Sequence, residues 1–236
     1  MKLRSPTSPR LVAIVGGSGA GKSWLTDRLQ KVFGEKASRM SLDDFYLDRS
    51  NLTPRQRARI NYDHPNAIDW PCVEQFLQNC RAGHICHVPR YDFKTHTRSL
   101  HCDRWQPKPL ILIEGLWLLL RPSIRRLFDF AIFIDCPASL RLRRRLARDQ
   151  VERGRSGASI RRQFRATVAP MHEQFVAPQV RWADVVLTQP LRDSEVHHLC
   201  DQLWALLTTS ALYPAWLQEL FRSETRALFK PAYIHE

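Results

Sequence analysis

Long apolar runs are missing from this sequence of 236 residues. Its most apolar stretch, 110–120, contains Glu114 and is shorter than the roughly 20 residues that a membrane-spanning helix needs. Residues 1–9 also lack the apolar core of a signal peptide, because basic residues and prolines interrupt them. We therefore expect a cytoplasmic protein that has no membrane partner.

Paired cysteines are absent as well, since none of the six cysteines belongs to a Cys-x-x-Cys motif. Scattered single cysteines do not build the framework of a small secreted domain, so we expect free thiols in a reducing compartment. One segment does gather potential zinc ligands, namely His84, Cys86, His87, His101 and Cys102. Their spacing fits no zinc module that we can name, so a zinc site is the less favoured interpretation.

Acidic residues are too few to balance the basic ones: 23 Asp and Glu stand against 36 Lys and Arg, for a formal charge of +13. This charge fits a solvated surface, a clamp for a small anionic substrate, or a track for a nucleic-acid backbone. The aromatic and Gly-rich patterns of common RNA-binding modules are absent. Many arginines fall within 141–165, and guanidinium groups suit phosphate. We therefore expect a phosphate clamp and no nucleic-acid partner.

Short apolar runs and helical patterns alternate along the chain. The runs 11–15, 110–113 and 130–134 predict buried strands, whereas 24–33 and 140–152 carry apolar residues at helical spacing. This alternation is typical of the α/β class, in which a parallel sheet is covered by helices on both faces.

The length favours a single domain, 1–236. Two strand-like segments predict a small β-hairpin insertion at 84–105, which we expect to bind the acceptor. The arginines at 141–165 predict a lid. The segment 208–236 is a C-terminal tail for which the sequence indicates no role.

A glycine-rich segment lies between the first predicted strand and the first predicted helix. It satisfies G-x-x-x-x-G-K-[ST] at every fixed position and comprises Gly16, Gly17, Ser18, Gly19, Ala20, Gly21, Lys22 and Ser23. Its glycines let backbone N–H groups turn toward phosphate oxygens, next to the positive end of a helix dipole. Lys22 should reach the β- and γ-phosphates, and the Ser23 hydroxyl should bind Mg²⁺. This P-loop predicts a nucleoside triphosphate ligand without distinguishing a kinase from an ATPase.

Two carboxylates follow predicted strands. Glu114 ends the run 110–113, at the edge where parallel sheets gather ligands, and is the expected second Mg²⁺ ligand; the alternative is a charge that faces solvent. Asp43 follows another predicted strand, and a kinase for an alcohol needs a carboxylate there to accept the hydroxyl proton. We expect Asp43 to face the P-loop across a gap sized for a sugar alcohol, and we interpret Asp44 as a turn cap.

Several blocks of the sequence resemble the uridine/cytidine kinases, within the wider group that includes phosphoribulokinase and pantothenate kinase. N-Y-D-H-P-N-A-I-D at 61–69 is highly specific for this family. The other blocks, in order, are D-D-F-Y at 43–46, P-R-Y-D-F at 89–93, H-T-R at 96–98, E-G at 114–115, R-D at 148–149, E-R-G-R at 152–155 and A-D-V-V at 183–186. The resemblance implies a P-loop kinase fold from the P-loop to about Leu187.

The resemblance also implies roles for single residues on the acceptor side. Asp43, the first acid of its block, resembles the catalytic base. Asp63 would bind the ribose hydroxyls, and Tyr62 would lie against the nucleobase. Tyr91 and His96 would read the pyrimidine, because an imidazole can donate or accept and so tolerates both uracil and cytosine.

The resemblance assigns arginines of the predicted lid as well. Arg145, Arg155 and Gln163 match positions that hold the nucleoside, whereas Arg148 and Arg153 match positions that clamp the triphosphate.

Plainer interpretations exist for some of these residues. Tyr62 and Tyr91 could be ordinary core aromatics. Arg141, Arg143 and Arg144 are interpreted as solvated helix residues.

Together these patterns predict a nucleoside kinase that transfers the γ-phosphate of ATP or GTP, with Mg²⁺, to the 5′-hydroxyl of uridine or cytidine in pyrimidine salvage. One rival is another small-molecule kinase of the same group, acting on ribulose 5-phosphate or a pantothenate-like alcohol. The other is an RNA-stimulated P-loop ATPase, which the charge of +13 would suit. The resemblance further implies a homo-oligomer, specifically a tetramer.

Overall fold

The structure is a computed structural model that describes residues 8–208, with only the backbone of Arg153. The predicted C-terminal tail, from residue 209 onward, and residues 1–7 lie outside the described part. No helix within 8–208 is long and apolar enough to cross a membrane.

A parallel sheet of five strands forms the centre of the molecule, in the order β2-β5-β1-β6-β7. The strands are β1 (Arg10–Gly16), β2 (Ala37–Ser41), β5 (Leu110–Gly115), β6 (Phe130–Asp135) and β7 (Val185–Thr188). The apolar runs predicted as strands lie in β1, β5 and β6, and they are buried because the sheet is covered on both faces. The predicted α/β class is confirmed.

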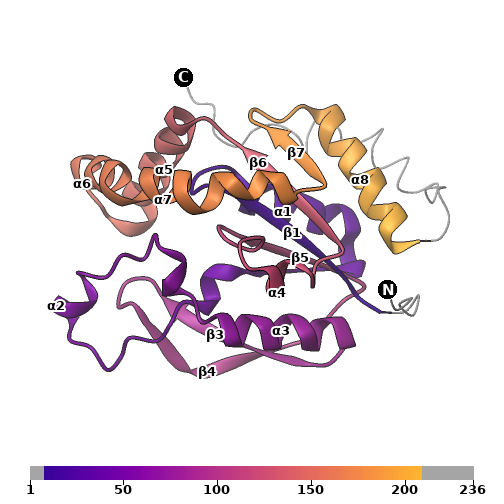
Figure 1. The fold of residues 1–236 in the computed structure, drawn as a ribbon, viewed down its shortest axis with the longest axis horizontal. Coiled ribbons are helices and arrows are strands. Elements are labelled where there is room, and N and C mark those ends of the chain that lie inside the picture. Colours follow the sequence, from indigo (N-terminus) through magenta and orange to yellow (C-terminus); the bar gives the residue numbers. More distant parts are fainter. Residues whose placement is uncertain (1–7, 209–236) are drawn as a thin grey trace.

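Helices cover the two faces of this sheet with separate apolar clusters (Figure 1). On one face lie α1 (Lys22–Phe33) and α8 (Asp193–Leu207). On the other lie α3 (Trp70–Ala82) and α4 (Pro122–Arg125).

The predicted hairpin is present, as the antiparallel pair β3 (Cys86–Asp92) and β4 (Thr97–Trp105). It packs on the 3₁₀ turn Leu42–Phe45, which follows β2. The short helix α2 (Pro54–Arg57) lies at the same end of the molecule (Figure 1).

A run of helical segments follows β6 on the opposite side from the hairpin (Figure 1). It contains α5 (Ala138–Arg153), α6 (Gly157–Gln163) and α7 (Ala169–Met171), and continues through helical turns to Trp182. A helix was expected at 140–152, but the segment 169–182 had no predicted structure. Pro170 and Pro178 interrupt its apolar periodicity, yet the chain stays helical through π and 3₁₀ turns.

Candidate active site

The P-loop connects β1 to α1, as the sequence predicted. Gly19 has a φ of 81°, and a Cβ there would lie 2.5 Å from the backbone oxygen of Arg141, so only glycine fits. Lys22 Nζ donates a hydrogen bond to the Gly17 carbonyl oxygen at 3.1 Å. Burial lowers the pKa of Lys22, while the carboxylates of Glu114 and Asp43 oppose this shift. The loop therefore holds a buried amine that faces two carboxylates.

The register of the sheet places Glu114, the second predicted Mg²⁺ ligand, near the amine of Lys22. Glu114 pairs with Ile14 of β1 on one side and with Ser41 of β2 on the other. Its Oε1 accepts a hydrogen bond from Ser23 Oγ at 2.6 Å. Burial raises the pKa of Glu114, whereas Lys22 and Ser23 lower it. The two predicted Mg²⁺ ligands, a hydroxyl and a carboxylate, are thus in direct contact.

Asp43 lies on the turn that follows β2, beside the same group of charges. Ser41 Oγ caps this turn by accepting a hydrogen bond from the Asp43 backbone N–H at 3.2 Å. The Asp43 carboxylate is close enough to act electrostatically on Lys22, Glu114 and Asp44. Asp43 therefore lies near the charges of the P-loop.

Carboxylates are crowded at this edge of the sheet. Burial, together with the charges of Asp43 and Glu114, raises the pKa of Asp44 to about 6. No hydrogen bond of the Asp44 side chain supports the interpretation of a turn cap, since Ser41 caps the turn. The three carboxylates repel one another, and a divalent cation that binds oxygen ligands would relieve this repulsion. These residues therefore fit Mg²⁺.

We predict that Asp44→Asn stabilises the protein at neutral pH. A carboxyl whose pKa is raised in the folded state prefers its protonated form there, so its ionised form destabilises the folded protein. This destabilisation is complete above about pH 6 and decreases as the pH falls toward the unfolded-state pKa of 3.8. Because Asp44 is partly exposed, we expect a gain of about 1–2 kcal/mol at pH 7.5. Urea unfolding should show the gain shrinking at pH 4.5; a gain independent of pH would contradict the assignment.

The predicted base-reading residues gather on the hairpin side. Tyr62 and His96 stack with ring centroids 4.0 Å apart at 11°, and Tyr91 Oη lies 3.2 Å from His96 Nδ1. The backbone of His96 has a φ of 56°, uncommon for a residue other than glycine. Tyr62 Oη is buried without a hydrogen-bond partner. The three rings form one cluster, although Tyr62 covers the face of the imidazole.

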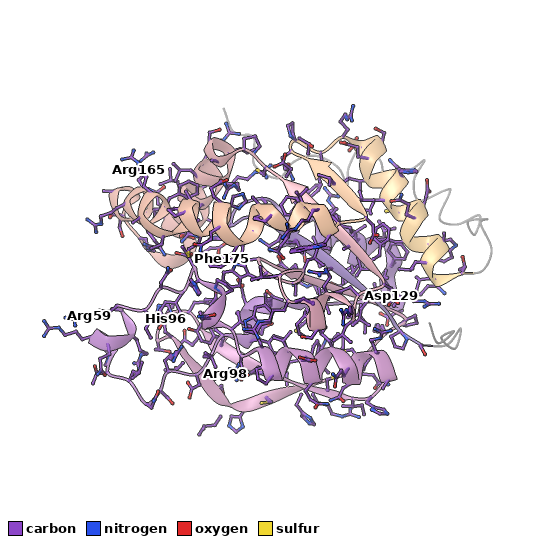
Figure 2. All side chains as sticks on the ribbon, in the orientation of Figure 1. Arg59, His96, Arg98, Asp129, Arg165 and Phe175 are labelled. Carbon is purple, nitrogen blue, oxygen red and sulfur yellow. The ribbon has the colours of Figure 1, made fainter. Side chains whose placement is uncertain are left out.

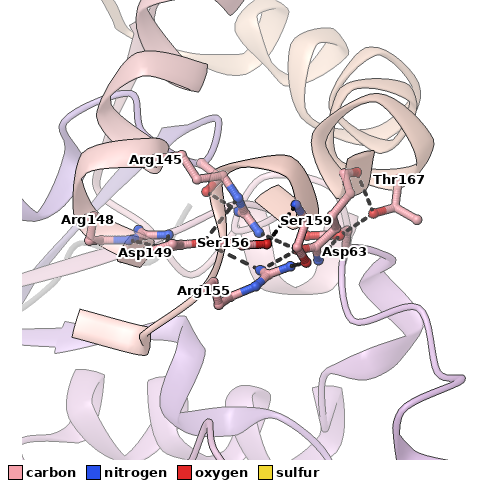
Figure 3. Close-up of polar contacts among 10 residues, drawn as sticks. Asp63, Arg145, Arg148, Asp149, Arg155, Ser156, Ser159 and Thr167 are labelled. Atoms are coloured by element: carbon pink, nitrogen blue, oxygen red, sulfur yellow. Dashed lines mark hydrogen bonds and ion pairs between the residues drawn. The ribbon is translucent and has the colours of Figure 1, made fainter. Parts of the chain in front are cut away.

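Asp63 is bound by the lid (Figure 3). Its Oδ2 accepts hydrogen bonds from Gln163 Nε2 at 3.1 Å and from Thr167 Oγ1 at 2.6 Å. Gln163 Oε1 in turn accepts from Arg145, whose other terminal nitrogen donates to Ser18 Oγ of the P-loop at 2.8 Å. A continuous chain of hydrogen bonds thus joins the P-loop to Asp63.

The expected gap for a sugar alcohol is not open. The hollow that Ser18 and Asp63 line together holds only about 10 Å³, far too little for a nucleoside. Gln163 binds Asp63 at this hollow, and side chains there must move before an acceptor can enter it.

The lid arginines converge on one buried acid (Figure 3). Asp149 is fully buried and forms ion pairs with Arg145, Arg148 and Arg155 at 3.4, 2.8 and 3.6 Å. Arg155 also donates to Gln163 at 2.6 Å, which links it to the residue that binds Asp63. The side chain of Arg153 lies outside the described part.

Two residues interpreted as solvated are in fact packed against the P-loop. Arg141 is 2% exposed. Arg144 donates to the Ala20 carbonyl oxygen at 3.3 Å and to Gln189 at 3.1 Å. The first turns of α5 lie on the loop, which the sequence of the helix alone does not show. Arg143 is exposed, as expected.

Sequence reasoning also missed His172, which lies in the helical segment it left unassigned. A Cβ at Gly17 would lie 2.8 Å from His172 Nδ1. Burial, with Arg141 and Lys22 nearby, lowers the pKa of His172 to about 4, so the ring is neutral at physiological pH. Its only sequence signal is a lone histidine between Pro170 and Pro178.

Arg98 ties the hairpin to the turn that carries Asp43. Its guanidinium donates to the carbonyl oxygens of Phe45 at 3.0 Å and Tyr46 at 2.7 Å, and pairs with Asp69 at 3.0 Å. Figure 2 shows Arg98 and His96 on the hairpin side of the molecule. The Arg98 side chain thus binds two carbonyl oxygens of the turn and the carboxylate of Asp69, the N-cap of α3.

We predict that Arg98→Met lowers kcat about tenfold or more and changes KM less, because small displacements of a reacting group are costly. Arg90→Met is the matched control, since Arg90 pairs with Asp103 on the same hairpin. Steady-state kinetics of the two variants provide the measurement. Equal effects in both would mean that Arg98 only stabilises the hairpin.

The histidines and cysteines of the hairpin do not assemble. Within residues 8–208, no group of three or more His, Cys, Asp or Glu side chains is placed to hold a metal ion. Cys80 and Cys86 lie with their sulfurs 3.6 Å apart, both buried as free thiols. The structure therefore gives no support to a zinc site within its described part.

A phosphate cradle between strand and helix, with a facing carboxylate, defines a P-loop phosphotransferase. Residues 11–196 match the model of the Phosphoribulokinase / Uridine kinase family. The chain belongs to this family, whose members use a nucleotide as phosphate donor, typically with Mg²⁺.

Known proteins resemble the chain in sequence and in fold. It is 39% identical to the uridine kinase of Staphylococcus haemolyticus over 180 residues, covering 76% of this chain and 87% of that protein. It is 40% identical to the uridine kinase of Chloroflexus aurantiacus over 181 residues, with 76% and 87% covered. Phosphoribulokinase from Rhodobacter spheroides has a TM-score of 0.56, covering 78% of this chain and 71% of that one; at 17% identity it shows a shared fold alone.

Proposed function

We propose that the protein is a uridine/cytidine kinase, which transfers the γ-phosphate of ATP or GTP to the 5′-hydroxyl of uridine or cytidine and gives UMP or CMP. Two uridine kinases with about 40% identity support this proposal. The observation that carries it is the contact of Ser23 Oγ of the P-loop with Glu114 at 2.6 Å, where the charge of Asp43 also acts on Lys22. Asp63 lines a hollow with Ser18 of the same loop. The expected cytoplasmic location remains a prediction.

Asp43 suits the role of general base. It lies on a turn whose backbone is held by Ser41 and Arg98, and its charge acts on Lys22 of the P-loop. A carboxylate at this place would orient the 5′-hydroxyl and accept its proton as the phosphoryl group moves. Lys22 would then balance the negative charge on the phosphate oxygens.

Ser23 and Glu114 would hold Mg²⁺. Their oxygens are in contact, and hard oxygen ligands suit this ion. When bound, the ion would shield the phosphate charges and so complement Lys22.

Asp63 suits recognition of a ribose. Both hydrogen bonds from the lid end on its Oδ2, which leaves Oδ1 for a ribose hydroxyl. His96 would accept from cytosine or donate to uracil, and Tyr91 would hold the ring through its contact with Nδ1. Asp63 would recognise the ribose diol, and His96 with Tyr91 would recognise the pyrimidine ring. This combination favours a ribonucleoside over ribulose 5-phosphate or pantothenate as the acceptor.

Arg148 would close over the phosphates, while Arg145 and Arg155 would hold the nucleoside. Asp149 pairs with Arg148 and Arg155, and Arg148 can exchange this carboxylate for a phosphate of similar geometry. Closure would exclude water and so limit hydrolysis of the donor.

A panel of acceptors tests the proposal. Purified protein with Mg²⁺ and either ATP or GTP should phosphorylate uridine and cytidine much faster than adenosine, ribulose 5-phosphate or pantothenate. Nucleotide hydrolysis should not rise when RNA is added. Preference for one of the other alcohols, or hydrolysis that RNA stimulates, would overturn the assignment.

A further inference from the structure

Arg141 is a buried cation without an anionic partner, directly behind the P-loop. Its side chain is 2% exposed. Nε donates to the Cys136 carbonyl oxygen at 3.1 Å, and Nη1 is buried without a hydrogen-bond partner. The ring of Phe164 lies 5.7 Å from Cζ. No carboxylate within the described residues forms an ion pair with this guanidinium.

Such a side chain is costly to bury. A guanidinium loses its hydration in the interior, and a carbonyl and a ring face compensate only part of that loss. Glu173 and Asp135 act on it only from a distance. The bond to the Cys136 carbonyl oxygen uses Nε alone and gives no reason for the buried, unpaired Nη1.

The unpaired end of Arg141 points at the loop. A Cβ at Gly17 would lie 2.8 Å from Nη1. Arg141 is also near enough to act electrostatically on Lys22. His172 also lies next to Gly17, and its ring cannot supply a negative charge to balance Arg141. Within residues 8–208, therefore, no acid is paired with Arg141 to neutralise it.

We propose that Arg141 is a second donor-binding cation, whose missing counter-charge is the polyphosphate of the nucleotide. Its charge under Gly17 attracts the phosphates, and their binding relieves the penalty of an unpaired buried guanidinium. The inference depends on the proposed function only in that the loop binds a nucleoside triphosphate. It holds for any acceptor alcohol.

The test compares Arg141→Met with Arg143→Met, which removes an exposed arginine from the same helix. Calorimetry without any acceptor gives the Kd for the Mg²⁺ complex of a non-hydrolysable ATP analogue, and thermal melts give Tm with and without it. We expect Arg141→Met to weaken binding about tenfold or more. Its Tm without nucleotide should equal or exceed that of the parent, while its Tm gain from the analogue should be smaller. Arg143→Met should change Kd less than about threefold.

Arg141→Lys separates charge from shape. It keeps a positive charge on a shorter side chain, so its Kd should lie between the values for the parent and for Arg141→Met. An unchanged Kd in Arg141→Met, or a lower Tm without nucleotide, overturns the proposal in favour of a structural arginine. Equal loss of affinity in the Met and Lys variants overturns it too. Because no acceptor is present, none of these outcomes depends on which alcohol the enzyme phosphorylates.

Discussion

Asp43→Asn should lower kcat about a thousandfold while both substrates still bind. The amide keeps the shape of the carboxylate but cannot accept the hydroxyl proton, and general-base catalysis of this kind contributes on the order of 10²–10⁴-fold. The turn should persist, because Ser41 bonds to the backbone of residue 43 and not to its side chain. Kinetics with uridine, together with calorimetric Kd values for nucleoside and nucleotide analogue, provide the measurement.

Asp44→Asn is the matched control for this variant. Asp44 is the next residue on the same turn, and its ionised carboxylate is disfavoured by burial and by Asp43. The control should keep kcat within about threefold of the parent enzyme, since it removes a charge but not the proton acceptor. A large loss of kcat in Asp44→Asn with a small loss in Asp43→Asn would mean that Asp44, and not Asp43, is the general base.

Asp63 should make the enzyme discriminate against deoxyribose. A partly buried carboxylate that binds a ribose hydroxyl loses that partner with 2′-deoxyuridine, and sites of this kind reject such analogues strongly. We expect kcat/KM for uridine to exceed that for 2′-deoxyuridine by about a hundredfold or more. In Asp63→Ala the value for uridine should fall by a similar factor, and the ratio of the two substrates should approach one.

Thr167→Val is the companion variant for Asp63. It removes one of the two lid hydrogen bonds to Oδ2 and leaves the carboxylate in place. We expect it to preserve the preference for uridine, with a change of at most about tenfold in kcat/KM. Loss of the preference in Thr167→Val, but not in Asp63→Ala, would mean that the lid and not Asp63 senses the ribose.

Local patterns were enough to predict the parts of this fold that depend on short-range physics. The P-loop follows from its glycines, and a local capping box begins α2. Thr53 accepts a hydrogen bond from the Gln56 backbone, and Gln56 Oε1 accepts one from the Thr53 backbone. Glu114 meets Ser23 because neighbouring parallel strands end at one edge of the sheet.

Tertiary packing decided what the sequence did not reveal. Arg141 and Arg143 have the same residue type two positions apart, yet one is buried and the other exposed. Only the docking of α5 on the P-loop separates them. The acceptor side is closed for a similar reason, since Tyr62 on His96 and Gln163 on Asp63 are contacts between distant segments. His172 was missed because prolines hid the helical character of its segment.

The measurement that tests this account most directly is ³¹P NMR of one reaction that contains the protein, Mg²⁺, ATP and uridine. A 5′-phosphomonoester signal of UMP should appear in step with ADP, with little inorganic phosphate, and both products should vanish when uridine is omitted. Inorganic phosphate that accumulates at the same rate with and without uridine would contradict a phosphoryl transfer from the P-loop to a nucleoside placed at Asp43.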